Sequence, residues 1–294
     1  MIASTQVAVI FNPKAGTAAR PDAREISELF RSVGLEARIT LVNMKAAQAT
    51  ALAVQQGTKL VVAAGGDGTI SGVASALVDT DTRLGILPRG TFNHFAKDLR
   101  IPLDPEAAVR VIAGGKEARV DVGEVNGRVF INNSSVGLYP NIVLERTREQ
   151  RMGRKKWAAF ILATLRVLRR FPRLAIRLNA EGKEIVRSTG LVFIGNNEYE
   201  IEGLDIGGRR RLDTGQLFCY VSHATTRWQL LRLIVDALMG RLRQSHEVDV
   251  LHGQEAWIAS RRRHLRVALD GEVTSLMPPL HYRIRPAALR VIVP

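Results

Sequence analysis

LVVAAGGDGT, residues 60–69, joins five apolar residues to a short turn of three glycines, one acid and one hydroxyl. The apolar half has the length and composition of a buried β-strand. Glycines adopt backbone conformations with positive φ and lack a Cβ, so a phosphate oxygen can approach main-chain N–H groups in such a turn. The largely apolar residues 70–78 follow and predict a helix whose N-terminus points at the same anion. The stretch therefore predicts a phosphate-binding loop between a strand and a helix.

Within this loop, Asp67 is a candidate ligand for a magnesium nucleotide and Thr69 a candidate donor to a phosphate. The pattern also fits a plain strand-to-helix turn, in which the glycines only allow the backbone conformation of the turn and Asp67 caps the helix. Two further segments favour the first interpretation, FNPKAG at 11–16 and LPRGTFNHFA at 87–96. Each continues a short apolar run into a loop of glycine, proline and small polar residues, so three similar loops are expected.

In their order and spacing, the patterns FNPxxG, GGDGT and GTxNxFA resemble the diacylglycerol kinase catalytic-domain family. Its members are soluble lipid kinases related to sphingosine and ceramide kinases, and they share a nucleotide-binding loop type with NAD kinases and phosphofructokinases. The resemblance is strong from residue 7 to residue 96 and weaker from there to the C-terminus. It implies an ATP-dependent lipid kinase.

Hydrophobic periodicity predicts strands alternating with helices in the first part of the chain. The expected strands are 7–11, 36–42, 59–64 and 83–87, and the expected helices are 22–33, 45–56, 70–78, 91–98 and 105–113. Such alternation favours an α/β N-terminal domain with a parallel sheet, whose ligands bind at the carboxyl ends of the strands. All three glycine loops are expected at that edge.

After residue 115 the pattern changes to short strand-like runs bounded by glycine, asparagine or charged residues. These runs predict a mainly antiparallel β-sandwich C-terminal domain interrupted by helices. The family resemblance implies the same division, with a parallel-sheet domain of the NAD kinase and phosphofructokinase type. We expect a nucleotide-binding domain at 1–122, to which 288–294 returns, and a lipid-substrate domain at 123–287.

Two helices are expected inside the second domain. Residues 146–173 hold ten Lys or Arg residues against one acid, Glu149, with apolar residues near helical spacing. A basic amphipathic helix of this kind fits an anionic bilayer surface, and it fits equally well a helix packed on the sheet with a solvated charged face. The second helix, 226–243, is expected to pack in the core.

The composition favours an anionic partner, because the formal net charge is +14. Aromatic residues make up only 5% of the chain and do not alternate with basic residues, and no Cys/His spacing fits a zinc finger, so nucleic acid is not expected as a partner. No apolar run approaches the ~18–20 residues that span a bilayer, and residues 1–6 lack the features of a secretory signal. The single cysteine, Cys219, fits a reducing cytoplasm. We expect a cytoplasmic protein that associates peripherally with an anionic membrane surface; no sequence feature indicates an oligomeric state.

Phosphoryl transfer to an alcohol also needs a base that takes the hydroxyl proton. The best candidate follows the apolar strand at 264–269, where Asp270-Gly271-Glu272 presents two carboxylates on a turn. The same residues fit an ordinary D–G hairpin turn. The family carries a DGE element at this place, and the resemblance implies that Glu272 accepts the proton of the lipid hydroxyl while Asp270 orients it or assists the metal.

The resemblance also implies the nucleotide contacts and the cofactor, a Mg²⁺ ion that ATP carries and that lies nearest Asp67. The implied contacts are Asn12, Thr40, Gly65, Gly66, Asp67, Gly68, Thr69 and Thr91. Thr40 also fits a plain strand residue, since threonine favours β-structure.

One stretch departs from the family. Bacterial relatives often read DDGxLD where this chain reads LDTGQLF at 212–218, and that stretch holds a second, structural Mg²⁺ in those relatives. Thr214 replaces an acid, and Phe218 stands where a further acid is common. Because Mg²⁺ prefers carboxylate oxygens, the site is weakened, with Asp213 the one remaining candidate ligand and Arg211 a possible substitute for its charge.

Two alternatives to the lipid kinase stay open. GGDGT serves NAD kinases too, and Asn197-Glu198 resembles an NE pair of that family. The second alternative is a non-catalytic protein that keeps the fold and binds nucleotide or membrane, against which the retained Asp67 and Glu272 argue. For a lipid kinase, diacylglycerol, a sphingoid base, ceramide, phosphatidylglycerol and a polyprenol all fit the sequence.

Overall fold

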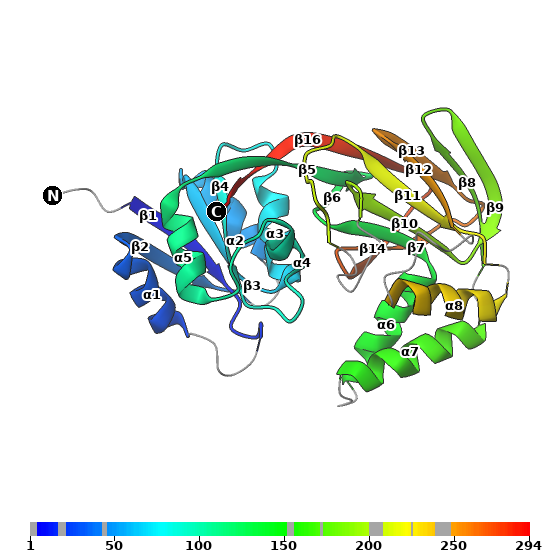
Figure 1. The fold of residues 1–294 in the computed structure, drawn as a ribbon, viewed down its shortest axis with the longest axis horizontal. Coiled ribbons are helices and arrows are strands. Elements are labelled where there is room, and N and C mark those ends of the chain that lie inside the picture. Colours follow the sequence, from blue (N-terminus) through cyan, green and yellow to red (C-terminus); the bar gives the residue numbers. More distant parts are fainter. Residues whose placement is uncertain are drawn as a thin grey trace. The chain divides into compact units, whose positions relative to one another are not determined.

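The computed structural model describes residues 5–16, 22–42, 46–151, 156–170, 173–199, 208–224, 226–238 and 248–294. The chain forms two compact units (Figure 1). The first unit comprises Met1–Val122 and Pro286–Pro294, and the second comprises Gly123–Arg285. The chain crosses from one unit to the other within two strands, β5 (Glu117–Val125) and β16 (Leu280–Ile292).

The first unit is the expected α/β unit with a parallel sheet. Its strands are β1 (Thr5–Phe11), β2 (Leu35–Leu41), β3 (Leu60–Gly65) and β4 (Arg83–Pro88), in the order β2-β1-β3-β4. Its helices are α1 (Ala23–Ser32), α2 (Ala46–Gln55), α3 (Asp67–Leu77), α4 (His94–Asp98) and α5 (Pro105–Gly114). The central strand β3 is buried along its whole length, as is usual for a parallel sheet covered on both faces.

The last part of β16 adds to this sheet beside β4, where Val291 pairs with Leu84 in parallel. Backbone hydrogen bonds from Asp79 N to Ala288 O (2.9 Å) and from Val293 N to Lys116 O (3.0 Å) fix the returning segment. The C-terminal residues therefore complete the sheet of the first unit.

Local sequence explains where two of these helices begin. Asp22 and Glu25 form a reciprocal capping box at the start of α1, and the backbone N–H groups of Glu25 and Arg24 hold the pKa of the Asp22 carboxyl below its usual value. Asp104 caps α5 by a one-way bond, in which its carboxylate accepts the Ala107 N–H (2.8 Å), and Pro105 takes the first helical position. Each cap satisfies N–H groups that a helix start leaves without an internal partner.

The second unit is an antiparallel sandwich, as expected. One sheet has the order β12-β11-β10-β7-β14-β15, and the other places β13, β8 and β9 beside the first part of β16, with the hairpin of β5 and β6 also paired to β16. The bounds are β6 (Arg128–Phe130), β7 (Asn133–Gly137), β8 (Leu174–Ala180), β9 (Lys183–Thr189), β10 (Leu191–Asn196), β11 (Leu217–Ser222), β12 (Val248–Gly253), β13 (Glu255–Ala259), β14 (Leu265–Leu269) and β15 (Glu272–Leu276). One hydrophobic core joins both sheets and includes Cys219, whose pKa burial raises to about 12. The cysteine is thus a core residue.

Three helices accompany the strands of this unit and share a small core of their own. They are α6 (Leu138–Arg151), α7 (Lys156–Arg170) and α8 (Arg227–Leu238), and Figure 1 shows them together at one end of the strands. Leu138, Ile142, Ala163, Val167 and Leu230 bury one side of each helix in this cluster. The single helix expected at 146–173 is wrong, since the structure has two helices there and α6 begins eight residues earlier; residues 152–155 lie outside the described residues. Among the described helices, none combines the length and the hydropathy that crossing a membrane requires.

Candidate active site

The three glycine loops of the first unit contact one another at the carboxyl ends of β1, β3 and β4. The backbone N–H of Asn12 donates to Ala64 O (3.0 Å), and that of Arg89 donates to Gly65 O (2.8 Å). The Asn12 side-chain amide donates to Thr69 Oγ1 (3.1 Å). The sheet therefore brings together Asn12, Gly65 and Thr69, three of the residues expected at the nucleotide.

Two of the glycines serve a close approach of two backbones. A Cβ on Gly66 would lie 3.1 Å from Gly90 Cα, and a Cβ on Gly90 would lie 2.8 Å from Gly66 Cα. Neither loop tolerates a side chain at this contact without a shift of the other. The GGDGT and GTxNxFA segments therefore fit together only with glycine at both positions.

Asp67 ties the GGDGT segment to the GTxNxFA segment. The expected helix at 70–78 begins three residues earlier, so Asp67 is the first residue of α3 rather than part of a loop before it. Its carboxylate accepts the backbone N–H of Asn93 (3.1 Å) and that of His94 (2.8 Å), at the start of α4. Asp67 is thus a cap, but of a helix 27 residues away. Each carboxylate oxygen has a second lone pair, so the half-buried group still has capacity to bind a Mg²⁺ ion while it accepts these N–H groups.

The remaining expected nucleotide contacts are exposed. Gly68 lies in the first turn of α3, Thr91 lies in the loop before α4, and Thr40 lies near the end of the edge strand β2, where it pairs with Ile10. Within the described residues, no hydrogen bond joins Thr40 or Thr91 to the other candidates. Their assignment to the nucleotide stays a prediction.

A buried arginine beside these loops was missed by the sequence reasoning. Arg89 directly follows β4, its side chain is buried, and its guanidinium lies 4.9 Å from the centre of the Phe11 ring. A buried positive charge at the ends of β1 and β4 makes this edge of the sheet favourable for an anion. An arginine directly after an apolar strand was the available signal.

In the second unit, Asp270 is held by three backbone donors. Its carboxylate accepts the N–H groups of Ile131 (2.9 Å), Asn132 (2.8 Å) and Asn133 (3.1 Å), and its own N–H donates to Asn133 O (2.9 Å). Asp270 adopts a left-handed conformation with φ of 47°, which aspartate tolerates better than most residues. The turn that it begins is therefore fixed to residues 131–133, where β7 starts.

Glu272 lies on the same turn in a different environment. It is the first residue of β15, it is exposed, and its carboxylate has no hydrogen-bond partner among the described residues. The two acids of the DGE element therefore divide into one that holds the turn and one that is accessible.

A buried polar cluster supports the segment that Asp270 binds. Arg209 is buried and donates to Ile131 O (2.8 Å), to Asn196 O (2.9 Å) and to Asn132 Oδ1 (2.8 Å). The side-chain amide of Asn196 also donates to Ile131 O (2.8 Å). Sequence reasoning missed Arg209, because its partners lie 13 to 78 residues away in the chain.

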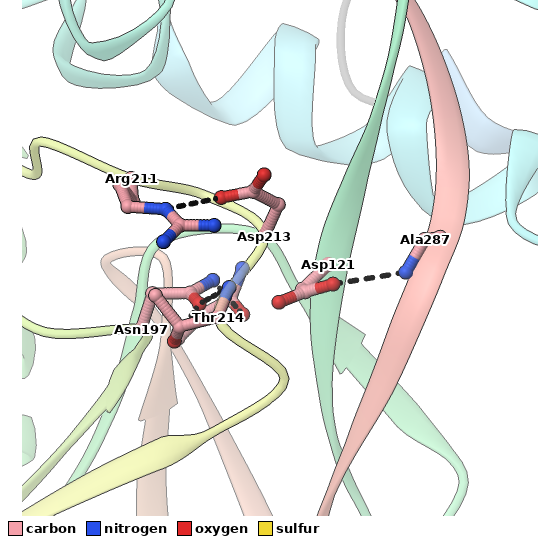
Figure 2. Close-up of polar contacts among 7 residues, drawn as sticks. Asp121, Asn197, Arg211, Asp213, Thr214 and Ala287 are labelled. Atoms are coloured by element: carbon pink, nitrogen blue, oxygen red, sulfur yellow. Dashed lines mark hydrogen bonds and ion pairs between the residues drawn. The ribbon is translucent and has the colours of Figure 1, made fainter.

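The stretch that departs from the family does not fit a structural Mg²⁺ ion. Figure 2 shows Arg211 beside Asp213 and Thr214 beside Asn197. Arg211 Nε lies 3.0 Å from Asp213 Oδ1, and the Thr214 backbone N–H donates to Asn197 Oδ1 (2.8 Å). The described residues contain no group of three or more His, Cys, Asp or Glu side chains placed to hold a metal. The Arg211 guanidinium therefore neutralises the charge of Asp213, the one remaining candidate ligand.

A groove of 690 Å³ lies elsewhere in the first unit. It is lined by residues of α1 and α5 that include Glu28, Leu29 and Val109, and by none of the candidate residues. Its acidic lining, with Glu25, Glu106 and Asp104, disfavours a nucleotide.

Comparison with known families and proteins agrees with this architecture. The model of the diacylglycerol kinase catalytic domain matches residues 6–125, and that of the YegS C-terminal NAD kinase beta sandwich-like domain matches residues 137–293. The probable lipid kinase YegS of Escherichia fergusonii is 29% identical over 286 residues, which cover 92% of this chain and 91% of that protein. A diacylglycerol kinase of Mycobacterium tuberculosis is 30% identical over 253 residues, which cover 83% and 80%.

Solved structures share the fold. The crystal structure of a putative diacylglycerol kinase from Bacillus anthracis matches with a TM-score of 0.77 and 21% identity, covering 100% of this chain and 99% of the other. Yeast NADH kinase complexed with NADH matches with a TM-score of 0.50 and 11% identity, covering 99% and 84%. The chain belongs to the diacylglycerol kinase catalytic-domain family, with a YegS-type C-terminal domain.

Proposed function

We propose that this protein transfers the γ-phosphate of Mg²⁺-ATP to the hydroxyl group of a diacylglycerol-like lipid. Its family supports a kinase that acts on lipid, and two of its named relatives are a probable lipid kinase and a diacylglycerol kinase. The observation that carries the proposal is the DGE turn, where Asp270 is fixed by three N–H groups and Glu272 is exposed beside it. A fixed turn with one accessible carboxylate suits a general base.

The first unit would bind the nucleotide. The N–H groups at the start of α3 suit phosphate oxygens, and glycine at 65, 66 and 68 leaves the backbone accessible. Asn12 and Thr69 would position the phosphates, while Arg89 adds positive charge. Asp67 would hold the Mg²⁺ that ATP carries, and this ion would neutralise charge that develops on the phosphates during transfer.

The second unit would act on the lipid. The oxygen of the lipid hydroxyl would attack the γ-phosphorus atom while Glu272 accepts the hydroxyl proton, and ADP would leave. Asp270 would act by positioning Glu272, since its own carboxylate already accepts three N–H groups.

The lipid substrate requires contact with a membrane. We propose that the protein is cytoplasmic and binds an anionic membrane surface peripherally, which its net charge of +14 supports. Long-range attraction to such a surface is screened over ~8 Å at physiological ionic strength, so binding should weaken as salt rises.

The direct test is incubation of the purified protein with γ-labelled ATP and Mg²⁺, together with mixed micelles of single lipids. The panel contains diacylglycerol, a sphingoid base, ceramide, phosphatidylglycerol and a polyprenol, with NAD as a soluble acceptor. We expect labelled phosphate on a lipid, with diacylglycerol as the first candidate. Labelled NADP with no labelled lipid would identify an NAD kinase instead, and nucleotide binding without any transfer would identify a non-catalytic protein.

A further inference from the structure

The outer side of α7 is apolar where a soluble helix is usually polar. Ala158, Ile161 and Leu165 are exposed, with exposed fractions of 56% for Ile161 and 52% for Leu165. Spacings of three and four residues place them on one stripe of the helix, which Arg169 continues. The opposite side is already buried, because Ala163 and Val167 lie in the three-helix core. The apolar stripe is therefore additional to the core-facing side of α7.

The neighbouring helix α8 repeats this arrangement. Trp228 has an exposed fraction of 73%, and Arg227 and Arg232 are exposed next to it in sequence and one helical turn later. Leu230, on another side of α8, is buried in the same three-helix core as Ala163. Both helices thus turn one side to a common core, while α7 exposes Ile161 and Leu165 on another side and α8 exposes Trp228.

The charges around these residues favour an anionic partner. The sequence of α7 has four basic residues and no acid. The nearest acids of α6, Glu145 and Glu149, form ion pairs with Arg166, and those hydrogen bonds, Glu149 first, raise the pKa of Arg166. These acids therefore do not offset Arg169.

We propose that the exposed sides of α7 and α8 form a membrane-binding face. This α7–α8 face consists of Ala158, Ile161, Leu165, Arg169, Arg227, Trp228 and Arg232. Its occupant is the surface of an anionic bilayer. The apolar residues enter the boundary between headgroups and acyl chains, where tryptophan is enriched, and the arginines contact lipid phosphates. This face is the surface through which the proposed lipid kinase would contact the membrane. The inference rests on that function, but it can be tested without measuring catalysis.

Vesicle co-sedimentation tests the face directly. The variant I161S/L165S/W228S is compared with wild type on vesicles of phosphatidylcholine with phosphatidylglycerol and on vesicles of phosphatidylcholine alone. The matched control is L52S/V186S, because Leu52 in α2 and Val186 in β9 have exposed fractions of 59% and 65% but lie outside the face. We expect the triple variant to bind anionic vesicles about tenfold more weakly, since it removes three inserted apolar side chains, and the control to bind within about twofold of wild type.

A second measurement reports insertion without a large change to the chain. The tryptophan fluorescence of wild type and of W228F is recorded with vesicles of brominated anionic lipid. The sequence has three tryptophans, so the difference between the two proteins isolates Trp228. We expect quenching that W228F loses for the most part. This readout also decides the case if the triple variant fails to fold, which its melting temperature shows.

Some results would overturn the face. Equal vesicle binding by the triple variant and wild type would do so, as would unchanged quenching in W228F. A wild-type dimer in analytical ultracentrifugation that the triple variant abolishes would assign the face to a second copy of this chain. Failure of the proposed function is recognised separately, as absence of labelled lipid from short-chain soluble diacylglycerol while vesicle binding persists.

Discussion

The GGDGT segment and the DGE turn use an aspartate in related ways. Asp67 accepts two backbone N–H groups from the start of α4, and Asp270 accepts three from residues 131–133, where β7 starts. Each aspartate thus holds a distant segment in place. The two segments differ in their accessible acids. The DGE turn also presents the exposed Glu272, whereas Asp67 is the one acid of the GGDGT segment.

The structure therefore distinguishes two roles of these acids, holding the local structure in place and contacting a substrate or metal. At the GGDGT segment, positioning and ligand binding fall on the same carboxylate, so a substitution there affects both. At the DGE turn they fall on different residues, so positioning and proton transfer can be altered one at a time.

Asp67→Ala should have the largest effect and leave no detectable phosphoryl transfer. It removes the proposed partner of Mg²⁺-ATP together with the acceptor for the Asn93 and His94 N–H groups. Loss of a capping acceptor also lowers the free energy of unfolding, by about 0.5–2 kcal/mol. Transfer is measured with γ-labelled ATP and stability by urea unfolding.

Asp67→Asn is the matched comparison. Asparagine keeps one acceptor oxygen for the two N–H groups and loses the charge, so stability should recover only in part while activity stays low. Near-normal turnover in Asp67→Asn would mean that Asp67 acts only as a cap.

Asp270→Asn should lower the free energy of unfolding by about 1.5–3 kcal/mol, the range for a hydrogen bond to a charged group. The amide has one acceptor oxygen in place of two, so it cannot serve Ile131 on one side and Asn132 with Asn133 on the other. Asparagine tolerates the left-handed backbone, so the loss reports the hydrogen bonds. Urea unfolding measures it, and a change under about 0.5 kcal/mol would contradict the positioning role.

Asp213→Asn should have the smallest effect. Its carboxylate forms one exposed ion pair with Arg211, and such pairs contribute about 0–1 kcal/mol. Because the stretch does not fit a structural metal, the melting temperature without nucleotide should be the same with Mg²⁺ and with a chelator. A Mg²⁺-dependent rise that Asp213→Asn removes would show that the metal site is intact after all.

Much of the first unit could be predicted from the sequence, since its buried strands are largely apolar runs that stop at glycine or proline: β3 ends in Gly65, β4 ends in Pro88, and Asn12-Pro13 follows β1. The strands of the second unit were harder to predict from the sequence. Strand β7 reads NSSVG, and its polar Ser134 is buried because Tyr282, 148 residues away, offers a hydroxyl 3.0 Å from it. Strand β9 alternates exposed and half-buried residues, so its apolar signal is weak.

The candidate site divides along the same line. Glycine loops and the DGE turn are local patterns, so their positions were predictable. The partners of Asp67, Asp270 and Arg209 lie far along the chain, and no local pattern encodes them. The functions of these residues therefore depend on tertiary contacts that only the fold supplies.

The central claim is that nucleotide binding and proton transfer belong to different segments, and Glu272→Gln tests it most directly. Titration calorimetry with Mg²⁺-ATP and turnover with γ-labelled ATP on diacylglycerol micelles are measured on the same preparation. The account predicts nucleotide affinity close to that of wild type with turnover reduced by roughly 10²–10⁴-fold, the usual contribution of a general base. Weakened nucleotide binding with normal turnover at saturating ATP would contradict it and assign Glu272 to the nucleotide.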